Sequence, residues 1–142
     1  MHSNFSEDVF ILDLDIITFG EKDLPDLGIP VKVTHAGILD SKELANLYRR
    51  CTAGLVLSGT NYSLVPNEMM ACGLPVVDID AQHTRLSYQP ETAVLAQPNP
   101  KSLATALNQL LNDAHLRGQF TETGLAATAD LSWNASNQRV EQ

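Results

Sequence analysis

A carboxylate at the start of a short predicted helix, together with the turn that precedes it, is the feature best suited to chemistry. The apolar run 55–57 ends at Ser58, the first of a cluster of turn formers. A helix is predicted to begin near Pro66, because proline is tolerated in the first helical turn, and Glu68 falls in that turn. Loops at the carboxyl ends of parallel strands bind ligands, and N–H groups at helix starts suit phosphate. The spacing therefore predicts a ligand site in segment 58–68.

The elements around this segment read as strands alternating with helices. Gly73 followed by Pro75 predicts the end of the helix, and Gly118 and Gly124 are expected to interrupt the last helix of the chain. Such alternation predicts an α/β fold, a Rossmann-like parallel sheet flanked by helices, in a single domain over residues 1–142. The expected strands cover 9–19, 31–34, 54–57, 76–79 and 92–96, and the expected helices cover 42–50, 66–72, 100–111 and 114–129.

Residues 58–77 read Ser-Gly-Thr-Asn-Tyr-Ser-Leu-Val-Pro-Asn-Glu-Met-Met-Ala-Cys-Gly-Leu-Pro-Val-Val. This run resembles the donor-binding signature of GT-B glycosyltransferases of the family-4 type. It is most similar to the rhamnosyltransferase-like branch, which has Leu-Ser-x-Thr-Asn-x-Ser-Leu-Val-Pro in this place. A looser resemblance extends over residues 16–140. The resemblance implies the C-terminal, donor-binding domain of a GT-B fold, incomplete at its first strand and helix and without the N-terminal acceptor domain.

The resemblance also implies roles for individual residues. Glu68 stands where the family accepts hydrogen bonds from the ribose of the donor nucleotide, and 61–64 stand where backbone N–H groups meet the diphosphate and sugar. Thr60 replaces a glutamate that usually contacts the sugar, a departure compatible with a 6-deoxy sugar such as rhamnose. Lys22, at another predicted strand end, offers a cation for phosphate. The expected donor-binding residues are Glu68, Thr60, Asn61, Tyr62, Ser63, Leu64 and Lys22.

Each of these residues also has a purely structural interpretation. Glu68 could complement the helix dipole at the surface, and residues 60–63 include ordinary turn formers whose side chains need no ligand. Lys22 could be a solvated loop lysine. Met69 and Cys72 are predicted to point to one helix face and Met70 to another, which suits packing rather than chemistry.

Two further constellations are weaker. Asp78 and Asp80 form an Asp-x-Asp pair that could hold a divalent cation on a diphosphate, but two aspartates at this spacing are a common pattern, so we expect no metal site. His83 and Arg85 follow the same strand; they could face a cleft, although surface turn residues are the default interpretation.

Composition limits the classes of partner and location. The net charge is −8, which argues against nucleic-acid binding, since that function needs a basic surface. Apolar runs are shorter than a membrane helix, and the sequence starting at Met1 lacks the pattern of a signal peptide. The two cysteines are then expected to be reduced thiols in a cytoplasmic protein without a transmembrane segment.

The functional hypothesis follows from the resemblance. We expect a hexosyl- or deoxyhexosyltransferase domain that binds a nucleotide diphosphate sugar for transfer to a saccharide acceptor in surface polysaccharide biosynthesis, without a cofactor. The general base and acceptor site are expected on the absent N-terminal domain, so no catalytic residue is assigned and the isolated chain is expected to be inactive. The expected partners are the nucleotide sugar and either that domain or a second copy. The alternative is a non-catalytic module that binds a nucleotide or a protein.

Overall fold

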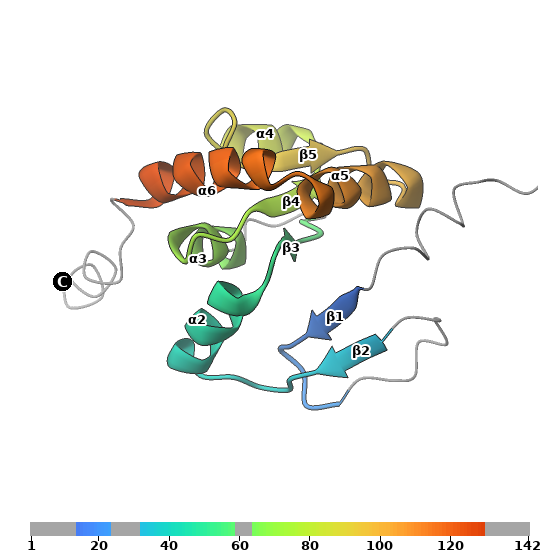
Figure 1. Ribbon diagram of the computed structural model, residues 1–142, viewed down its shortest axis with the longest axis vertical. Helices are drawn as coiled ribbons and strands as arrows, with labels where there is room; N and C mark the ends of the chain where they lie inside the picture. Colours follow the sequence, from blue (N-terminus) through green and yellow to red (C-terminus); the bar gives the residue numbers. More distant parts are fainter. Residues whose placement is uncertain (1–13, 24–31, 59–63, 130–142) are drawn as a thin grey trace, which may run out of the picture. The chain divides into compact units, whose positions relative to one another are not determined.

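The computed structural model describes residues 14–23, 32–58 and 64–129, and the chain divides into two compact units, 1–44 and 45–142. Among the described residues the fold is mixed α/β, with parallel sheets flanked by helices (Figure 1). The predicted Rossmann-like fold class is therefore confirmed. The tail around Trp133 lies outside the described residues.

The first unit contains a two-stranded parallel sheet of β1 (Asp15–Thr18) and β2 (Lys32–His35). Both strands alternate between exposed and half-buried positions, as is usual for strands with one face covered. The His35 Nε2 atom donates to the carbonyl of Glu21, which leaves Nδ1 to accept a 2.8 Å bond from the Thr18 hydroxyl. These contacts tie the end of β2 to the end of β1.

Helix α2 (Ser41–Arg50) starts at a side-chain cap. The Asp40 Oδ1 atom accepts a 2.8 Å hydrogen bond from the N–H of Glu43, so Asp40 makes the cap. Leu47 and Tyr48 are buried on the apolar face of α2.

The second unit is built on a three-stranded parallel sheet in the order β3–β4–β5. The strands are β3 (Gly54–Leu55), β4 (Val76–Ile79) and β5 (Val94–Ala96). Val76 and Val77 of the central strand are fully buried, as expected for a parallel strand covered on both faces. Helix α5 (Pro100–Asn112) packs on β4 and β5, and its Leu110 is fully buried in the core.

Helix α6 (Ala114–Thr128) packs against α5 and against α3 (Val65–Ala71) (Figure 1). The helix predicted over 114–129 is confirmed, and the interruption expected at its two glycines is absent, because α6 runs unbroken through Gly118 and Gly124. Gly124 is buried: a Cβ atom there would lie 3.3 Å from the Cβ and Cγ atoms of Met70. Glycine at this position therefore lets α6 approach α3 closely instead of ending the helix.

The remaining helix, α4 (Gln82–Ser87), was not predicted from the sequence. His83 and Arg85 belong to it, so their interpretation as turn residues is wrong. The helix lacks a side-chain cap at its first boundary residue, Ala81. Instead, the Thr84 Oγ1 atom accepts a 2.9 Å bond from the Ala81 N–H and donates a 2.7 Å bond to the Ile79 carbonyl, which joins α4 to the end of β4.

Candidate functional site

The predicted donor-binding residues lie in three parts of the chain. One part is outside the described residues, one is at the start of α3, and one is in the first unit. Residues 60–63, that is Thr60, Asn61, Tyr62 and Ser63, lie outside the described residues, so their roles stay predictions. Leu64 precedes α3 and its side chain is 63% exposed. Glu68 lies in the first turn of α3 and is half-buried. Lys22 is exposed and belongs to the first unit, whereas Glu68 belongs to the second, so the role of Lys22 toward phosphate also stays a prediction.

Helix α3 begins and ends where the local sequence signals place it. Pro66 lies in its first turn, and the N–H of Glu68 donates a 3.0 Å bond to the carbonyl of Leu64. At the other end Gly73 has φ +82°, and the N–H of Leu74 donates to the Met69 carbonyl at 3.0 Å. This last bond spans the reversal of the chain in a Schellman motif and requires glycine in the left-handed conformation.

Two methionines hold α3 between the sheet and α6. Met69 packs toward β3, where a Cβ atom on Gly54 would lie 2.6 Å from its Sδ atom. Met70 packs toward α6, against Gly124. Both side chains are buried, at 5% and 3% exposed, on the different faces that helical spacing predicts. The position of Glu68 is therefore set by packing on two sides of a short helix.

The Glu68 carboxyl is an acceptor that is partly withdrawn from water. Burial raises its pKa above the ordinary value of 4.5. Within the part of the chain that the structure describes, no hydrogen bond or ion pair to its side-chain oxygens is seen. A carboxylate in this situation gains from donors that a ligand supplies, because a hydrogen bond to a charged group is worth more than one between neutral groups.

The neighbouring thiols and phenol do not look reactive. Burial raises the pKa of Cys51 and of Cys72; nearby Arg50 opposes the shift at Cys51, and Arg49 opposes it at Cys72. Burial, followed by the negative charge of Glu68, raises the pKa of Tyr48 to about 12. Both cysteines are free thiols. Protonated, half-buried thiols suit packing rather than nucleophilic or metal chemistry, as predicted for Cys72.

A second group of residues surrounds the exit of β3, and sequence reasoning missed it. Asp78 is fully buried, and its Oδ1 atom accepts bonds from the N–H groups of Ser58, at 2.9 Å, and Ile79, at 2.7 Å. The Tyr88 hydroxyl donates a 2.8 Å bond to its Oδ2 atom. On the other side of the same peptide segment, His83 Nε2 donates to the carbonyl of Ser58. We call Ser58, Asp78, His83 and Tyr88 the Ser58 clamp.

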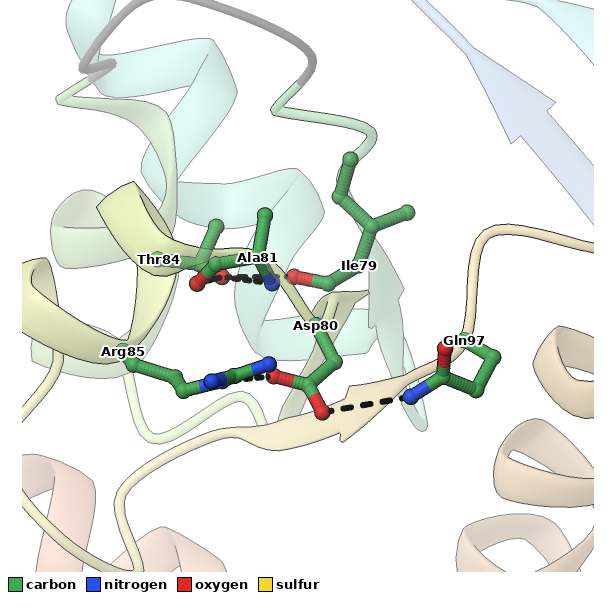
Figure 2. A network of polar contacts seen from close by, with 6 residues as sticks. All are labelled: Ile79, Asp80, Ala81, Thr84, Arg85 and Gln97. Atoms are coloured by element: carbon green, nitrogen blue, oxygen red, sulfur yellow. Dashed lines mark hydrogen bonds and ion pairs between the residues drawn. The ribbon is translucent and has the colours of Figure 1, made fainter.

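The other aspartate of the Asp-x-Asp pair has separate partners. Figure 2 shows the Asp80 carboxylate between Arg85, whose Nε atom is bonded to Oδ1, and Gln97, whose Nε2 atom lies 3.3 Å from Oδ2. Asp78 and Asp80 are thus each engaged by protein donors. In the described residues, no group of three or more His, Cys, Asp or Glu side chains has an arrangement suited to a metal ion.

The fold and the signature segment together define a C-terminal domain of the GT-B class. Residues 4–108 match the family described as WsaF, C-terminal domain. The chain is 33% identical to the O-antigen biosynthesis protein RfbC of Myxococcus xanthus over 115 residues, which are 80% of the present chain. It is 30% identical to the D-inositol 3-phosphate glycosyltransferase of Frankia alni over 118 residues, which are 81% of the present chain. The chain therefore belongs to the WsaF C-terminal domain family of GT-B glycosyltransferases, and the resemblance seen in the sequence is confirmed.

The aligned region is a small part of these relatives. It spans 9% of the Myxococcus protein and 29% of the Frankia enzyme. A second D-inositol 3-phosphate glycosyltransferase, from Catenulispora acidiphila, is 30% identical over 113 residues, which are 26% of its length. None of the helices that the structure describes combines the length and apolar character needed to cross a membrane.

Proposed function

We propose that the chain binds a nucleotide diphosphate sugar and holds it for transfer to a saccharide acceptor. The observation that carries this proposal is the Glu68 carboxylate. It is half-buried in the first turn of α3, within the signature segment, and lacks a hydrogen-bonding partner in the described part of the chain. The two hydroxyls of a ribose are donors of the kind that such a carboxylate requires.

The packing of α3 supports this role. Met69 and Met70 fix the helix against β3 and α6, so the carboxylate of Glu68 is held in place before a ligand arrives. Preorganisation of this kind reduces the entropy that binding must overcome. The Thr121 hydroxyl of α6 donates a 2.9 Å bond to the carbonyl of Gly73, which joins the chain just after α3 to α6.

The donor sugar and the acceptor are proposed from chemistry and from the relatives' names. Thr60, in place of a glutamate, is compatible with a 6-deoxy sugar such as rhamnose, so we propose a hexosyl or deoxyhexosyl donor. One relative is named as an O-antigen biosynthesis protein and two as D-inositol 3-phosphate glycosyltransferases. We therefore propose that the chain takes part in the synthesis of a surface polysaccharide. We propose that it does so in the cytoplasm and without a cofactor.

The transfer step is proposed to need residues beyond this chain. Donor phosphate is stabilised by N–H groups and cations while an acceptor hydroxyl attacks the sugar. We place the base and the acceptor on an N-terminal GT-B domain, because the chain spans only 9% to 29% of the relatives it matches. Partner binding by this chain is then either to that domain or to a second copy.

Titration of the 142-residue chain with UDP, dTDP and GDP, followed by NMR, tests the proposal. We expect one of the three to shift resonances of α3 and of the β3 exit in a saturable manner, while inorganic phosphate does not reproduce the full response. Adenosine serves as a control for stacking of a base without a diphosphate. Absence of a saturable response to all three nucleotides at millimolar concentration would refute the proposal.

A further inference from the structure

Helix α3 is too short to fix its own position. It has 7 residues, and the residue before it, Leu64, makes no side-chain capping bond. Isolated helices of this length are unstable in water, so packing against neighbouring elements must hold α3 in place. Glu68 is followed directly by Met69 and Met70, the two residues through which α3 packs. The place of the Glu68 carboxylate is therefore decided by the elements that hold α3.

Helix α6 holds α3 through two contacts on one of its faces. The Thr121 hydroxyl donates a 2.9 Å bond to the carbonyl of Gly73, which follows α3. Gly124 lies three residues further along α6, hence on the same face, and is buried against Met70. A hydrogen bond and a close packing contact therefore act together on the last turn of α3 and on the residue pair that ends it.

The contact at Gly124 acts on the backbone of α3. A Cβ atom added there would lie 3.3 Å from both the Cβ and the Cγ atom of Met70. Because a Cβ atom is bonded directly to the backbone, no change of rotamer moves it away, and α3 itself must shift by a few tenths of an ångström. At Gly54, on the other side of α3, an added Cβ would instead meet the flexible ends of Met69 and Leu74.

We propose that Thr121 and Gly124 are positioning residues for the contact between Glu68 and the ribose. The proposal rests on the function proposed above, and it assigns to α6, which lies outside the signature segment, the placement of the carboxylate. All residues from Glu68 to Gly73 belong to the described part of the chain, so the connection from α6 to the carboxylate is continuous. Hydrogen bonds weaken with small errors of distance and angle, so a small shift of a supporting element is costly.

The hydroxyl of Thr121 has a matched control on the same helix. Thr121→Val removes the donor to Gly73 and keeps the shape of the side chain. Thr123→Val makes the same change at a hydroxyl that donates a 2.7 Å bond to the carbonyl of Glu91, in the connection between α4 and β5. A general effect of losing a hydroxyl bond from α6 would appear in both variants, whereas an effect through α3 would appear only in Thr121→Val.

The close contact at Gly124 also has matched controls. Gly118→Ala makes the same substitution in the same helix, where a Cβ atom meets nothing within 4 Å. Gly54→Ala adds a Cβ atom on the other side of α3, where side-chain ends can yield. Leu110→Val is the control for stability, because Leu110 is fully buried in the core cluster with Val77.

Three quantities are measured for each variant of the 142-residue chain. The first is the affinity for UDP, dTDP or GDP, whichever the wild type binds most tightly. The second is the factor by which affinity falls for the 3′-deoxy analogue of that nucleotide, since all three nucleotides carry a 3′-hydroxyl. This hydroxyl factor reports the contact with the sugar rather than contacts with base or phosphate. The third is the free energy of unfolding, obtained by urea denaturation.

We expect a hydroxyl factor of roughly tenfold or more in the wild type, because hydrogen bonds to a carboxylate are strong. Thr121→Val and Gly124→Ala should each weaken binding of the parent nucleotide roughly three- to tenfold and lower the hydroxyl factor by the same ratio. Gly54→Ala should lose less than Gly124→Ala.

The three remaining variants, Thr123→Val, Gly118→Ala and Leu110→Val, should keep the affinity and the hydroxyl factor within about twofold of wild type, whatever their free energies of unfolding.

The outcomes separate the positioning role from the proposed function. A wild-type hydroxyl factor in both Thr121→Val and Gly124→Ala would overturn the positioning role and leave the proposed function intact. An equal fall of the factor in Leu110→Val would assign the effect to general stability and overturn the positioning role as well. A wild type that binds a nucleotide and its 3′-deoxy analogue equally would contradict the ribose contact itself. If the wild type binds none of the three nucleotides, the proposed function fails and the positioning role fails with it.

Discussion

Tyr48 of α2 and Glu68 of α3 are electrostatically coupled. Burial is the largest cause of the rise in the pKa of Tyr48 to about 12, and the negative charge of Glu68 is the next. The carboxylate that we propose to meet the ribose therefore lies beside a phenol that stays protonated over the physiological range. This pairing gives Glu68 a spectroscopic reporter that is independent of any ligand.

The first prediction concerns alkaline pH. The pKa of Tyr48 is higher in the folded chain than its ordinary value of 10.0, so the folded state binds more protons than the unfolded state between pH 10 and about 12. Stability contributed by this proton is complete below pH 10 and is lost as the pH rises through that window. We expect Glu68→Gln to lower the pKa of Tyr48, but not to its ordinary value, because burial remains.

Ultraviolet titration of the phenolate measures this shift, and Tyr48→Phe identifies the step that belongs to Tyr48. Glu122→Gln, which removes an exposed carboxylate from α6, is the matched control and should leave the step unchanged. An identical Tyr48 step in wild type and Glu68→Gln would show that the two groups are not coupled.

The second prediction uses the two glycines of α6. Gly118 is exposed, and a Cβ atom there would meet nothing within 4 Å. Gly118→Ala should therefore stabilise the chain by up to about 1 kcal/mol through helix propensity. At Gly124 the same gain is opposed by contact with Met70, so Gly124→Ala should be less stable than Gly118→Ala by about 1–3 kcal/mol. Urea denaturation measures both, and equal stability of the two variants would contradict the close approach of α3 and α6.

The third prediction concerns association. β3 is one of the two outer strands of its three-stranded sheet. Leu55 of β3 is 45% exposed, and Leu57, two residues beyond the strand, is 62% exposed. An apolar strand edge favours pairing with another chain. We expect a dimer or a larger species, and Leu57→Lys should shift it toward monomer.

Light scattering across a concentration series tests this association. Leu86→Lys, at the 80%-exposed position on α4, is the control for a general effect of added charge and should leave the association intact. A clean monomer of the wild-type chain at high concentration would count against the role of the β3 edge.

The fourth prediction is that the 142-residue chain alone does not transfer sugar. The aligned region covers 29% of the Frankia glycosyltransferase, and we place the acceptor and the base elsewhere in the complete enzyme. Assays of donor hydrolysis and of transfer to a saccharide, each with UDP- and dTDP-linked sugars, should show no turnover. Clear turnover by the purified chain without a partner would contradict this part of the proposal.

Local signals in the sequence located α3 and its boundaries well. Pro66, Gly73 and Pro75 each act on the backbone within one or two residues, so their effect is visible without knowledge of the fold. The same holds for Pro100, where the predicted helix 100–111 begins. Helix α5 starts there, and the Asn99 side chain accepts a 2.8 Å bond from the N–H of Ser102. Signals of this kind depend on dihedral angles and nearby hydrogen bonds alone.

Features that depend on distant partners were not predictable. In the sequence, Asp78 was interpreted as one half of an Asp-x-Asp pair. Its hydrogen-bond partners Ser58 and Tyr88 lie 20 and 10 residues away along the chain. Gly124 read as a helix interruption because its reason, the proximity of Met70, is tertiary. Helix α4 escaped notice because Thr84, which bonds both Ala81 and Ile79, caps it from inside its first turn.

The most direct test of the central claim compares nucleotide binding by wild type and Glu68→Ala, measured by calorimetry or by NMR where binding is weak. A carboxylate that accepts two ribose hydroxyls makes charge-assisted bonds of about 1.5–3 kcal/mol each, so Glu68→Ala should weaken binding by roughly one to several powers of ten. Glu68→Gln should lose less because the amide keeps an acceptor, and Asn67→Ala and the charge-matched Glu122→Ala should change little. Equal affinity of wild type and Glu68→Ala for the nucleotide would contradict the account and return Glu68 to the role of a helix-dipole residue.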